Sequence, residues 1–173
     1  MDSALKEKIS RVKVLALDVD GVLTDGKIIV DSSGNEIKNF DVQDGLGMVL
    51  FRKHGFRIAI ITARSSKPVD FRAKDLHVDK VYQDASPKTE FYKRMLKELE
   101  VSDGEVCFVG DDLTDLGVLK QAGFAVTVPN GVDEVKRIAD YTTHKHGGHG
   151  AVREVIELIL KTQGKWDEIV AAL

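Results

Sequence analysis

The 173-residue sequence has only one cysteine, three prolines and one tryptophan, and 6% of its residues are aromatic. A single cysteine, Cys107, excludes an intrachain disulfide and a thiol-rich metal site. Because Cys107 lies in an apolar run, a buried structural thiol is favoured over a nucleophile. The sequence must therefore be stabilised by an ordinary hydrophobic core.

Long apolar stretches and blocks of one charge are also missing. No apolar run approaches the roughly 20 residues that cross a bilayer, and residues 1–11 lack the apolar middle of a signal peptide. The net charge is -3 without a basic block, so neither a membrane nor a nucleic acid is expected as a partner. The composition, 43% hydrophobic and 31% charged, predicts one globular domain over residues 1–173 and a cytoplasmic location.

Short apolar runs alternate with helical patterns along the chain, which predicts a parallel sheet with helices on both faces. The predicted fold class is therefore α/β, a Rossmann-like doubly wound sheet. Residues 27–41 interrupt the alternation and predict a small β-hairpin after the first strand, too small to be a cap domain. Strands are expected at 12–17, 56–61, 80–82, 106–109 and 125–128, and helices near 46–54, 67–76, 89–99, 115–122, 132–139 and 151–160.

Polar side chains follow the apolar runs. The first run ends in Asp18-Val19-Asp20-Gly21-Val22-Leu23-Thr24-Asp25-Gly26. A polar turn is the plain interpretation of this stretch, but acids at the end of a buried strand also lie where α/β folds bind ligands. Thr62 with Arg64, Lys88, and Asp111-Asp112-Leu113-Thr114-Asp115 occupy equivalent places after later runs.

Because the carboxyl ends of parallel strands share one edge, Asp18, Asp20, Thr62 and Asp111 should converge. Clustered carboxylates raise one another's pKa values unless a cation lies between them. An all-oxygen set suits Mg²⁺, while Thr62 and Lys88 can bind phosphate oxygens. This combination predicts phosphoryl transfer.

These motifs resemble those of the haloacid dehalogenase superfamily of phosphatases, in which they occur in the same order. The chain is also similar, over nearly its whole length, to the capless 3-deoxy-D-manno-octulosonate 8-phosphate (KDO 8-P) phosphatases. The marks of that group are Gly21-Val22-Leu23-Thr24-Asp25-Gly26, Asp41-Val42-Gln43-Asp44-Gly45 and Gly147-Gly148-His149-Gly150-Ala151-Val152-Arg153-Glu154.

The resemblance implies a two-step mechanism. Asp18 would attack phosphorus, and Asp20 would protonate the leaving hydroxyl and then activate water. Asp18, the backbone carbonyl of Asp20, and Asp111 would hold Mg²⁺, with Asp112 and Asp115 orienting the groups around them. Thr62, Ala63 and Lys88 would bind the phosphate.

The resemblance also implies a sugar-acid phosphate as substrate and KDO and phosphate as products. The KDO would be used in lipopolysaccharide synthesis. Arg64 and Arg72 would meet the sugar carboxylate, although solvated or salt-bridged arginines are the alternative. Ala63 stands where the family usually has glycine, and Val49 where relatives carry arginine. Asp41, Val42, Gln43, Asp44 and Gly45 would line the sugar pocket.

The family resemblance further implies a homotetramer assembled through the hairpin, with the C-terminal tail near a neighbouring active site. Trp166, Ile169, Val170 and Leu173 fall at helical spacing and should dock on the same domain or on a neighbour. Three nearby histidines suggest zinc only weakly, because no cysteine accompanies them. These are His144, His146 and His149.

Three alternatives remain at this stage. The substrate could be a nine-carbon sugar acid 9-phosphate, although Arg64 favours the octulosonate. A phospho-accepting receiver domain also combines acids, Mg²⁺, Thr and Lys on a doubly wound sheet, but its acceptor follows a middle strand of the sequence. A non-catalytic relative is disfavoured by the intact Asp18, Asp20, Thr62, Lys88 and Asp111.

Overall fold

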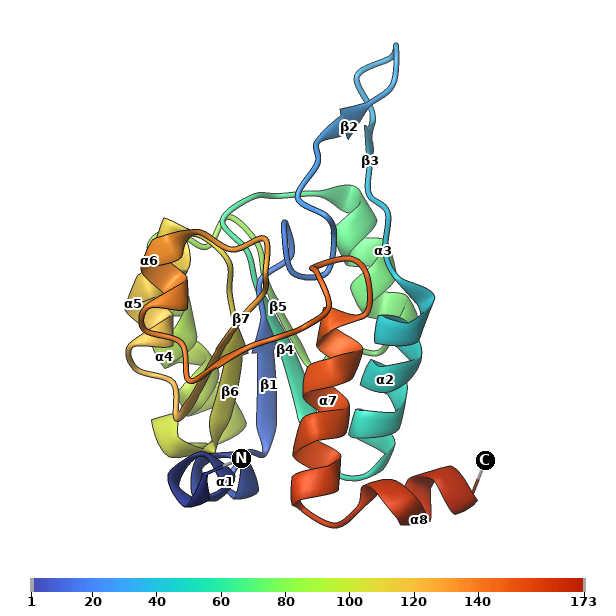
Figure 1. Cartoon of the computed structure of the whole chain (residues 1–173). Coiled ribbons are helices and arrows are strands. Elements are labelled where there is room, and N and C mark those ends of the chain that lie inside the picture. Colours follow the sequence, from blue (N-terminus) through green and yellow to red (C-terminus); the bar gives the residue numbers. More distant parts are fainter. Residues whose placement is uncertain (1, 173) are drawn as a thin grey trace.

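A central parallel sheet carries the fold in the computed structural model, which describes residues 2–172. Its strand order is β5-β4-β1-β6-β7-β8 (Figure 1), and all its neighbouring pairs run parallel. This topology confirms the predicted doubly wound α/β fold. The strands are β1 (Val14–Leu17), β4 (Arg57–Ile61), β5 (Lys80–Tyr82), β6 (Val106–Val109), β7 (Phe124–Thr127) and β8 (Tyr141–Thr142).

Helices cover both faces of the sheet, because its strands are apolar on both sides. Leu15 and Leu17 of β1 belong to the core of one face, and Val14 and Ala16 to that of the other. Cys107 is buried in the first core, as expected. The first face is covered by α1 (Ser3–Ser10), α2 (Val42–Lys53), α3 (Lys67–Asp75) and α7 (Ala151–Thr162), and the second by α4 (Lys88–Leu99), α5 (Leu116–Leu119) and α6 (Asp133–Lys136).

A hairpin of β2 (Ile29–Val30) and β3 (Glu36–Ile37) projects from one end of the molecule (Figure 1). It occupies the predicted place, although its strands are shorter than the expected arms. The Asp31 carboxylate accepts hydrogen bonds from the backbone amides of Ser33 and Asn35 and so fixes the turn. No second domain is inserted within the residues described.

Several boundaries differ from the predicted ones. The first helix after the hairpin begins at Val42 rather than near residue 46, because the Asp41 side chain caps it by accepting from the amides of Gln43 and Asp44. The helical segments after β6 and β7 are shorter than expected: α5 follows a 3₁₀ turn, η2 (Leu113–Asp115), and α6 spans one turn. A second 3₁₀ turn, η1 (Asp103–Glu105), precedes β6, and α1 and β8 were not predicted.

The chain ends in a short helix, α8 (Trp166–Ala171), which packs against its own domain. Ile169 is buried in the core of the first face, while Trp166 packs against that core and faces the Arg153 guanidinium. Docking on the same domain thus accounts for Trp166 and Ile169, whereas Val170 is 50% exposed and does not dock. The last predicted member, Leu173, lies outside the described residues. No helix among residues 2–172 has the length and apolar character needed to span a membrane.

Candidate active site

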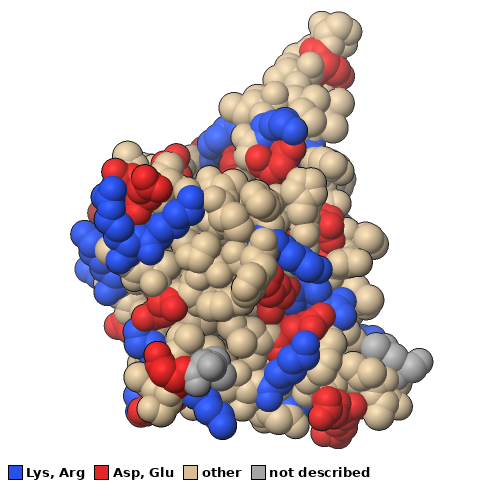
Figure 2. All heavy atoms as spheres, in the orientation of Figure 1, with Lys and Arg blue, Asp and Glu red and all other residues tan. Residues whose placement is uncertain are grey.

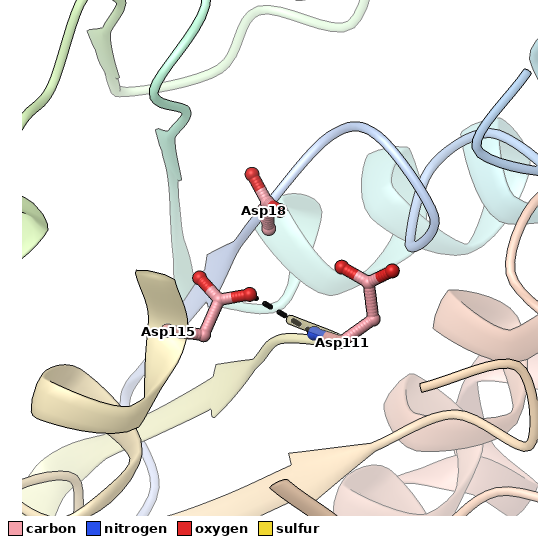
Figure 3. A group of neighbouring side chains, drawn as sticks. All are labelled: Asp18, Asp111 and Asp115. Carbon is pink, nitrogen blue, oxygen red and sulfur yellow. Dashed lines mark hydrogen bonds between the residues drawn. The ribbon is translucent and has the colours of Figure 1, made fainter. Parts of the chain in front are cut away.

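Two acidic side chains emerge from adjacent central strands. Asp18 follows β1 and Asp111 follows Gly110 at the end of β6, and these strands pair in register from Val14 with Val106 to Leu17 with Val109. The Asp18 amide continues the ladder by donating to the carbonyl of Val109 at 3.0 Å. Carboxylate oxygens of Asp18, Asp111 and Asp115 lie within 4.8 Å of one another (Figure 3). The predicted convergence at the sheet edge is therefore present for these acids.

Lys88, the first residue of α4, lies between two of these carboxylates. Its Nζ is 2.8 Å from Asp18 Oδ1 and 2.7 Å from Asp115 Oδ1, and its side chain is 2% exposed. Burial alone would lower the pKa of Lys88, but the charges of Asp18 and Asp115 together raise it. Lys88 therefore supplies a permanent positive charge beside Asp18.

Asp115 is fully engaged by the protein itself. While Oδ1 accepts from Lys88, Oδ2 accepts from the amide of Asp112 at 3.2 Å and from that of Asp111 at 3.0 Å (Figure 3). Gly110 permits this packing, because a Cβ there would lie 2.6 Å from the Asp115 side chain. Asp112 is exposed and caps η2 through the amide of Leu113. Asp115 thus holds the Asp111 loop in place.

Asp111 has the oxygen that is free to bind a cation. Its Oδ1 is buried and has no hydrogen-bond partner among the described residues. Burial, with the nearby charges of Asp18 and Asp115, raises the pKa of Asp111 to about 8. Burial and Asp115 likewise raise the pKa of Asp18 to about 7, against the opposing effect of Lys88. An unpartnered carboxylate oxygen beside a second carboxylate fits a hard cation such as Mg²⁺.

Gly21 leaves the room that Asp111 occupies. It has φ +92°, and a Cβ at this position would lie 1.9 Å from Asp111 Oδ2. We expect Gly21→Ala to displace Asp111, lowering the free energy of unfolding by about 1–3 kcal/mol and raising the Mg²⁺ concentration needed for half-maximal activity about 10-fold or more. Urea unfolding and Mg²⁺ titration of activity measure the two effects.

Gly34→Ala is the matched control, because Gly34 also has positive φ (+83°) but no atom within 4 Å of the added Cβ. Gly34→Ala therefore introduces the same kind of backbone strain as Gly21→Ala, but its added Cβ contacts no other atom. An equal change in Mg²⁺ requirement in the two variants would contradict the role assigned to Gly21.

Thr62 emerges at the same edge as Asp18. Because Leu17 pairs with Ile60, Thr62 lies just past the end of β4, on the other side of β1 from Asp111. It is 3% exposed, and its backbone is fixed between Tyr82 and Ala85. Ala63 follows it and is half-buried. The fold thus places the proposed phosphate-binding hydroxyl and the two acids around the end of one central strand.

Asp20 faces two cations. Lys38, just after β3, forms an ion pair with its Oδ1, and Arg64 Nη1 lies 3.4 Å from its Oδ2. Both cations also contact Glu36 Oε1, at 3.3 Å from Lys38 Nζ and 2.8 Å from Arg64 Nη2. Arg64, predicted to meet a sugar carboxylate, is bound here to carboxylates of the protein itself.

The expected sugar-pocket residues have mixed surroundings. Val42 is 78% exposed, and the Gln43 side chain lies 3.5 Å from Lys145 Nζ. Gly45 leaves room for the Arg72 side chain, because a Cβ at position 45 would lie 2.2 Å from Arg72 Nη2. A small cavity is lined by Asp41, Asp44, Gly45 and Arg72 together with apolar side chains. Four of the residues predicted to bind the sugar thus line the same small cavity.

Asp44 is buried against the start of α7. Its Oδ1 accepts from the Arg153 amide at 2.7 Å, its Oδ2 has no partner within the described chain, and burial raises its pKa from 3.8 to about 6. Between these pH values the unfolded chain loses a proton that the folded protein keeps, so stability falls as pH rises. Asn stays neutral and can keep the Arg153 bond.

We therefore expect the free energy of unfolding of Asp44→Asn, relative to that of the wild type, to increase by about 3 kcal/mol between pH 4 and pH 7. Urea unfolding at several pH values measures this difference. Glu105→Gln should show the opposite sign at lower pH, between about pH 2 and pH 4.5, because a bond from Lys13, with those from Ser102, lowers the Glu105 pKa from 4.5 to about 2. A pH-independent difference for Asp44→Asn would contradict the prediction.

Asn130 is a supporting residue that gave no signal in the sequence. The Asn130 side chain donates to the carbonyl of Gly21 at 2.8 Å and accepts from the amide of Gly147 at 2.9 Å, which joins two loops. Gly147 and Gly148 lie so close to the 21–25 loop that a Cβ on Gly147 would be 1.7 Å from the Gly21 carbonyl. The glycine-rich stretch is thus a packing element. Within residues 2–172, the acid triad is the only group of three or more His, Cys, Asp or Glu side chains close enough to share a metal ion.

Comparisons with known proteins agree with this geometry. The family model of haloacid dehalogenase-like hydrolases matches residues 71–156. A 3-deoxy-D-manno-octulosonate 8-phosphate phosphatase of Salmonella typhi is 41% identical over 161 residues, 93% of this chain and 86% of the relative. The phosphatase of that name from Escherichia coli K12 is 40% identical over the same shares.

Solved structures are similar over almost the whole fold. The phosphatase of this name from Moraxella catarrhalis, in complex with magnesium ion, phosphate ion and KDO, has a TM-score of 0.96 and 43% identity, and 99% of each chain is covered. The cobalt-bound deoxy-D-mannose-octulosonate 8-phosphate phosphatase from Haemophilus influenzae has a TM-score of 0.88 and 33% identity, with 91% of this chain and 92% of that chain covered.

Proposed function

Because the chain belongs to the 3-deoxy-D-manno-octulosonate 8-phosphate phosphatases within the haloacid dehalogenase-like hydrolases, we propose that it hydrolyses KDO 8-P to KDO and phosphate, a step of lipopolysaccharide synthesis. The observation that carries the proposal is the pair of acids at the ends of adjacent strands, Asp18 and Asp111, with the buried Lys88 at the start of α4 beside Asp18. It combines a nucleophile, a cation site and a phosphate-binding charge in one place.

The roles of the residues follow from their positions. Asp18 Oδ1 is held by Lys88, which leaves Oδ2 to attack phosphorus and form an aspartyl-phosphate. As the bond between phosphorus and the sugar oxygen breaks, Asp20, two residues further and half-buried, donates a proton to that oxygen, which leaves as a hydroxyl; Asp20 then takes a proton from the attacking water. Thr62, the Ala63 backbone and Lys88 donate to the phosphate oxygens, while Asp112 and Asp115 hold the Asp111 loop and Lys88.

Asp18, Asp111 and the carbonyl of Asp20 are proposed to hold Mg²⁺, and the unpartnered oxygen of Asp111 is the feature that fits it. Bound there, Mg²⁺ offsets the charge of phosphate and carboxylate oxygens as they approach each other. The protein's own contribution is to hold Asp18 and Asp111 close together, where burial raises the pKa of Asp18 to about 7 and that of Asp111 to about 8; a cation held by both would favour their ionised forms.

The substrate is tested by steady-state kinetics over a panel of sugar-acid phosphates with and without Mg²⁺. KDO 8-P should be hydrolysed with the highest kcat/KM, and EDTA should abolish turnover. Asp41, Val42, Gln43, Asp44, Gly45, Arg64 and Arg72 are proposed to shape the sugar pocket. A much higher kcat/KM for a nine-carbon 9-phosphate would overturn the octulosonate assignment, and a stable phosphoprotein without turnover would favour a receiver domain.

We further propose that the protein acts in the cytoplasm as a homotetramer. Large apolar side chains of the hairpin are exposed, including Ile28 (64%) and Val30 (56%), and Figure 2 shows uncharged residues between an acidic patch near the hairpin tip and the charges at its base. Such a surface gains by being covered. Because α8 lies at the opposite end of the domain from the hairpin (Figure 1), the tail would approach an active site only from a neighbouring subunit. Sedimentation measures the mass.

A further inference from the structure

The Asp20 carboxylate is held by a closed ring of charges at the base of the hairpin. Lys38 contacts Asp20 and Glu36, and Arg64 contacts the same two acids. Each carboxylate therefore meets both cations, and each cation meets both carboxylates. The ring joins the loop after β1, the segment after β3 and the loop after β4, which are far apart in the sequence.

Lys38 is the buried member of this ring. Its side chain is 2% exposed, whereas Arg64 remains 42% exposed. The hairpin around Lys38 is open, with Ile37 half exposed. A buried ammonium is costly unless its partners compensate it, and an apolar residue would fill the same space. Of its two partners, Glu36 belongs to the hairpin itself, whereas Asp20 lies in the loop after β1, so Lys38 ties the base of the hairpin to Asp20.

We propose that Lys38 is a positioning residue for Asp20: through its ion pair it fixes the carboxylate in the orientation needed to protonate the leaving group and activate water. This inference rests on the proposed function of Asp20. Glu36 keeps Lys38 and Arg64 in place on the far side of the ring. The base of the hairpin thereby contributes to the reaction, because general acid–base catalysis depends on the position of the group to within about 1 Å.

The test compares Lys38→Met, which keeps length and removes charge, with Lys38→Arg and with Lys27→Met as control. Lys27 lies on the other arm of the hairpin, and its side chain is 76% exposed. Each variant is assayed with KDO 8-P and with p-nitrophenyl phosphate, which lacks the sugar. Both substrates pass through the same aspartyl-phosphate, whose hydrolysis needs Asp20.

We expect Lys38→Met to lower kcat about 10- to 100-fold on both substrates while KM changes less than about threefold. Lys38→Arg should recover a large part of kcat, and Lys27→Met should retain wild-type values. A phosphorylated intermediate should accumulate in Lys38→Met during turnover of p-nitrophenyl phosphate. If Lys38→Met does not fold, Glu36→Gln tests the same ring and should lower kcat in the same sense.

Two results would overturn the proposal. If KM rises for KDO 8-P alone and p-nitrophenyl phosphate is unaffected, Lys38 binds the sugar. If only the melting temperature falls and kcat is retained, the ring is purely structural. Failure of the proposed substrate is separable, because a wild type that hydrolyses p-nitrophenyl phosphate but not KDO 8-P still reports on Lys38. A wild type inactive on both with Mg²⁺ present would contradict both proposals.

Discussion

Asp18→Asn should abolish turnover, with kcat reduced on the order of 10⁴-fold or more. The amide has nearly the shape of the carboxylate but cannot form an acyl phosphate. Because Asn also removes a buried negative charge, the folded protein should be retained, with substrate still held by Thr62 and Lys88. Phosphate release measures the rate, and calorimetry with KDO 8-P measures binding.

Asp133→Asn is the matched control, since Asp133 is an exposed aspartate at the start of α6 and its substitution makes the same change in net charge. It should keep wild-type kinetics. Residual turnover of Asp18→Asn above a few per cent, with deamidation excluded by mass spectrometry, would remove Asp18 as nucleophile.

Most of the sheet was predictable because its strands are buried on both faces. Such strands read as continuous apolar runs, as in Val106–Val109. The edge strand β8 has two residues, of which Thr142 is exposed, so no run marks it. The α1 helix is rich in charge and buries only Ile9, which leaves too narrow an apolar stripe to recognise.

The start of α2 was hidden by its glycines, which are unfavourable inside helices. Here they serve close packing: a Cβ on Gly47 would lie 2.9 Å from the Arg153 side chain in α7, and one on Gly45 would collide with Arg72. The local preference is overridden by tertiary contacts that a single sequence does not display. Asp41 caps this helix, but in the sequence it is one acid in a polar stretch, and nothing there distinguishes it as a cap.

The acids at the strand ends were predictable because the geometry of a parallel sheet fixes where they lie. The partners of Asp20 were not, since they depend on how the hairpin folds back. Lys38 follows Ile37 in an exposed arm, and nothing in its neighbours distinguishes a buried lysine from a solvated one. Sequence reasoning thus predicted that acids would meet at the sheet edge, but not the charges that hold Asp20.

Lys88→Met should lower both stability and kcat, with an effect on kcat second only to that of Asp18→Asn. The substitution leaves Asp18 and Asp115 buried without their shared cation. Removing one partner of a buried ion pair costs about 3–5 kcal/mol. We expect the free energy of unfolding to fall by about this amount at pH 8, and kcat to fall at least 100-fold as the phosphate loses a charged donor. Urea unfolding and phosphate release measure the two effects.

The pH dependence separates electrostatics from lost packing in this variant. Asp18, whose pKa is already raised from 3.8 to about 7, loses the cation that favours its charged form, so its pKa should rise further. The folded state then keeps a proton that the unfolded chain releases above pH 3.8, and the stability of Lys88→Met should decrease from pH 4 to pH 8 more steeply than that of the wild type.

Adding Asp115→Asn to Lys88→Met removes one of the two stranded charges. We expect this double variant to recover part of the stability at pH 8 while remaining inactive, because neither residue can then hold the phosphate or the Asp111 loop as before. If instead the single variant loses the same free energy at every pH and Asp115→Asn restores nothing, the cost lies in packing. The two carboxylates would then not depend on Lys88 for their charge, and its place beside Asp18 would need another explanation.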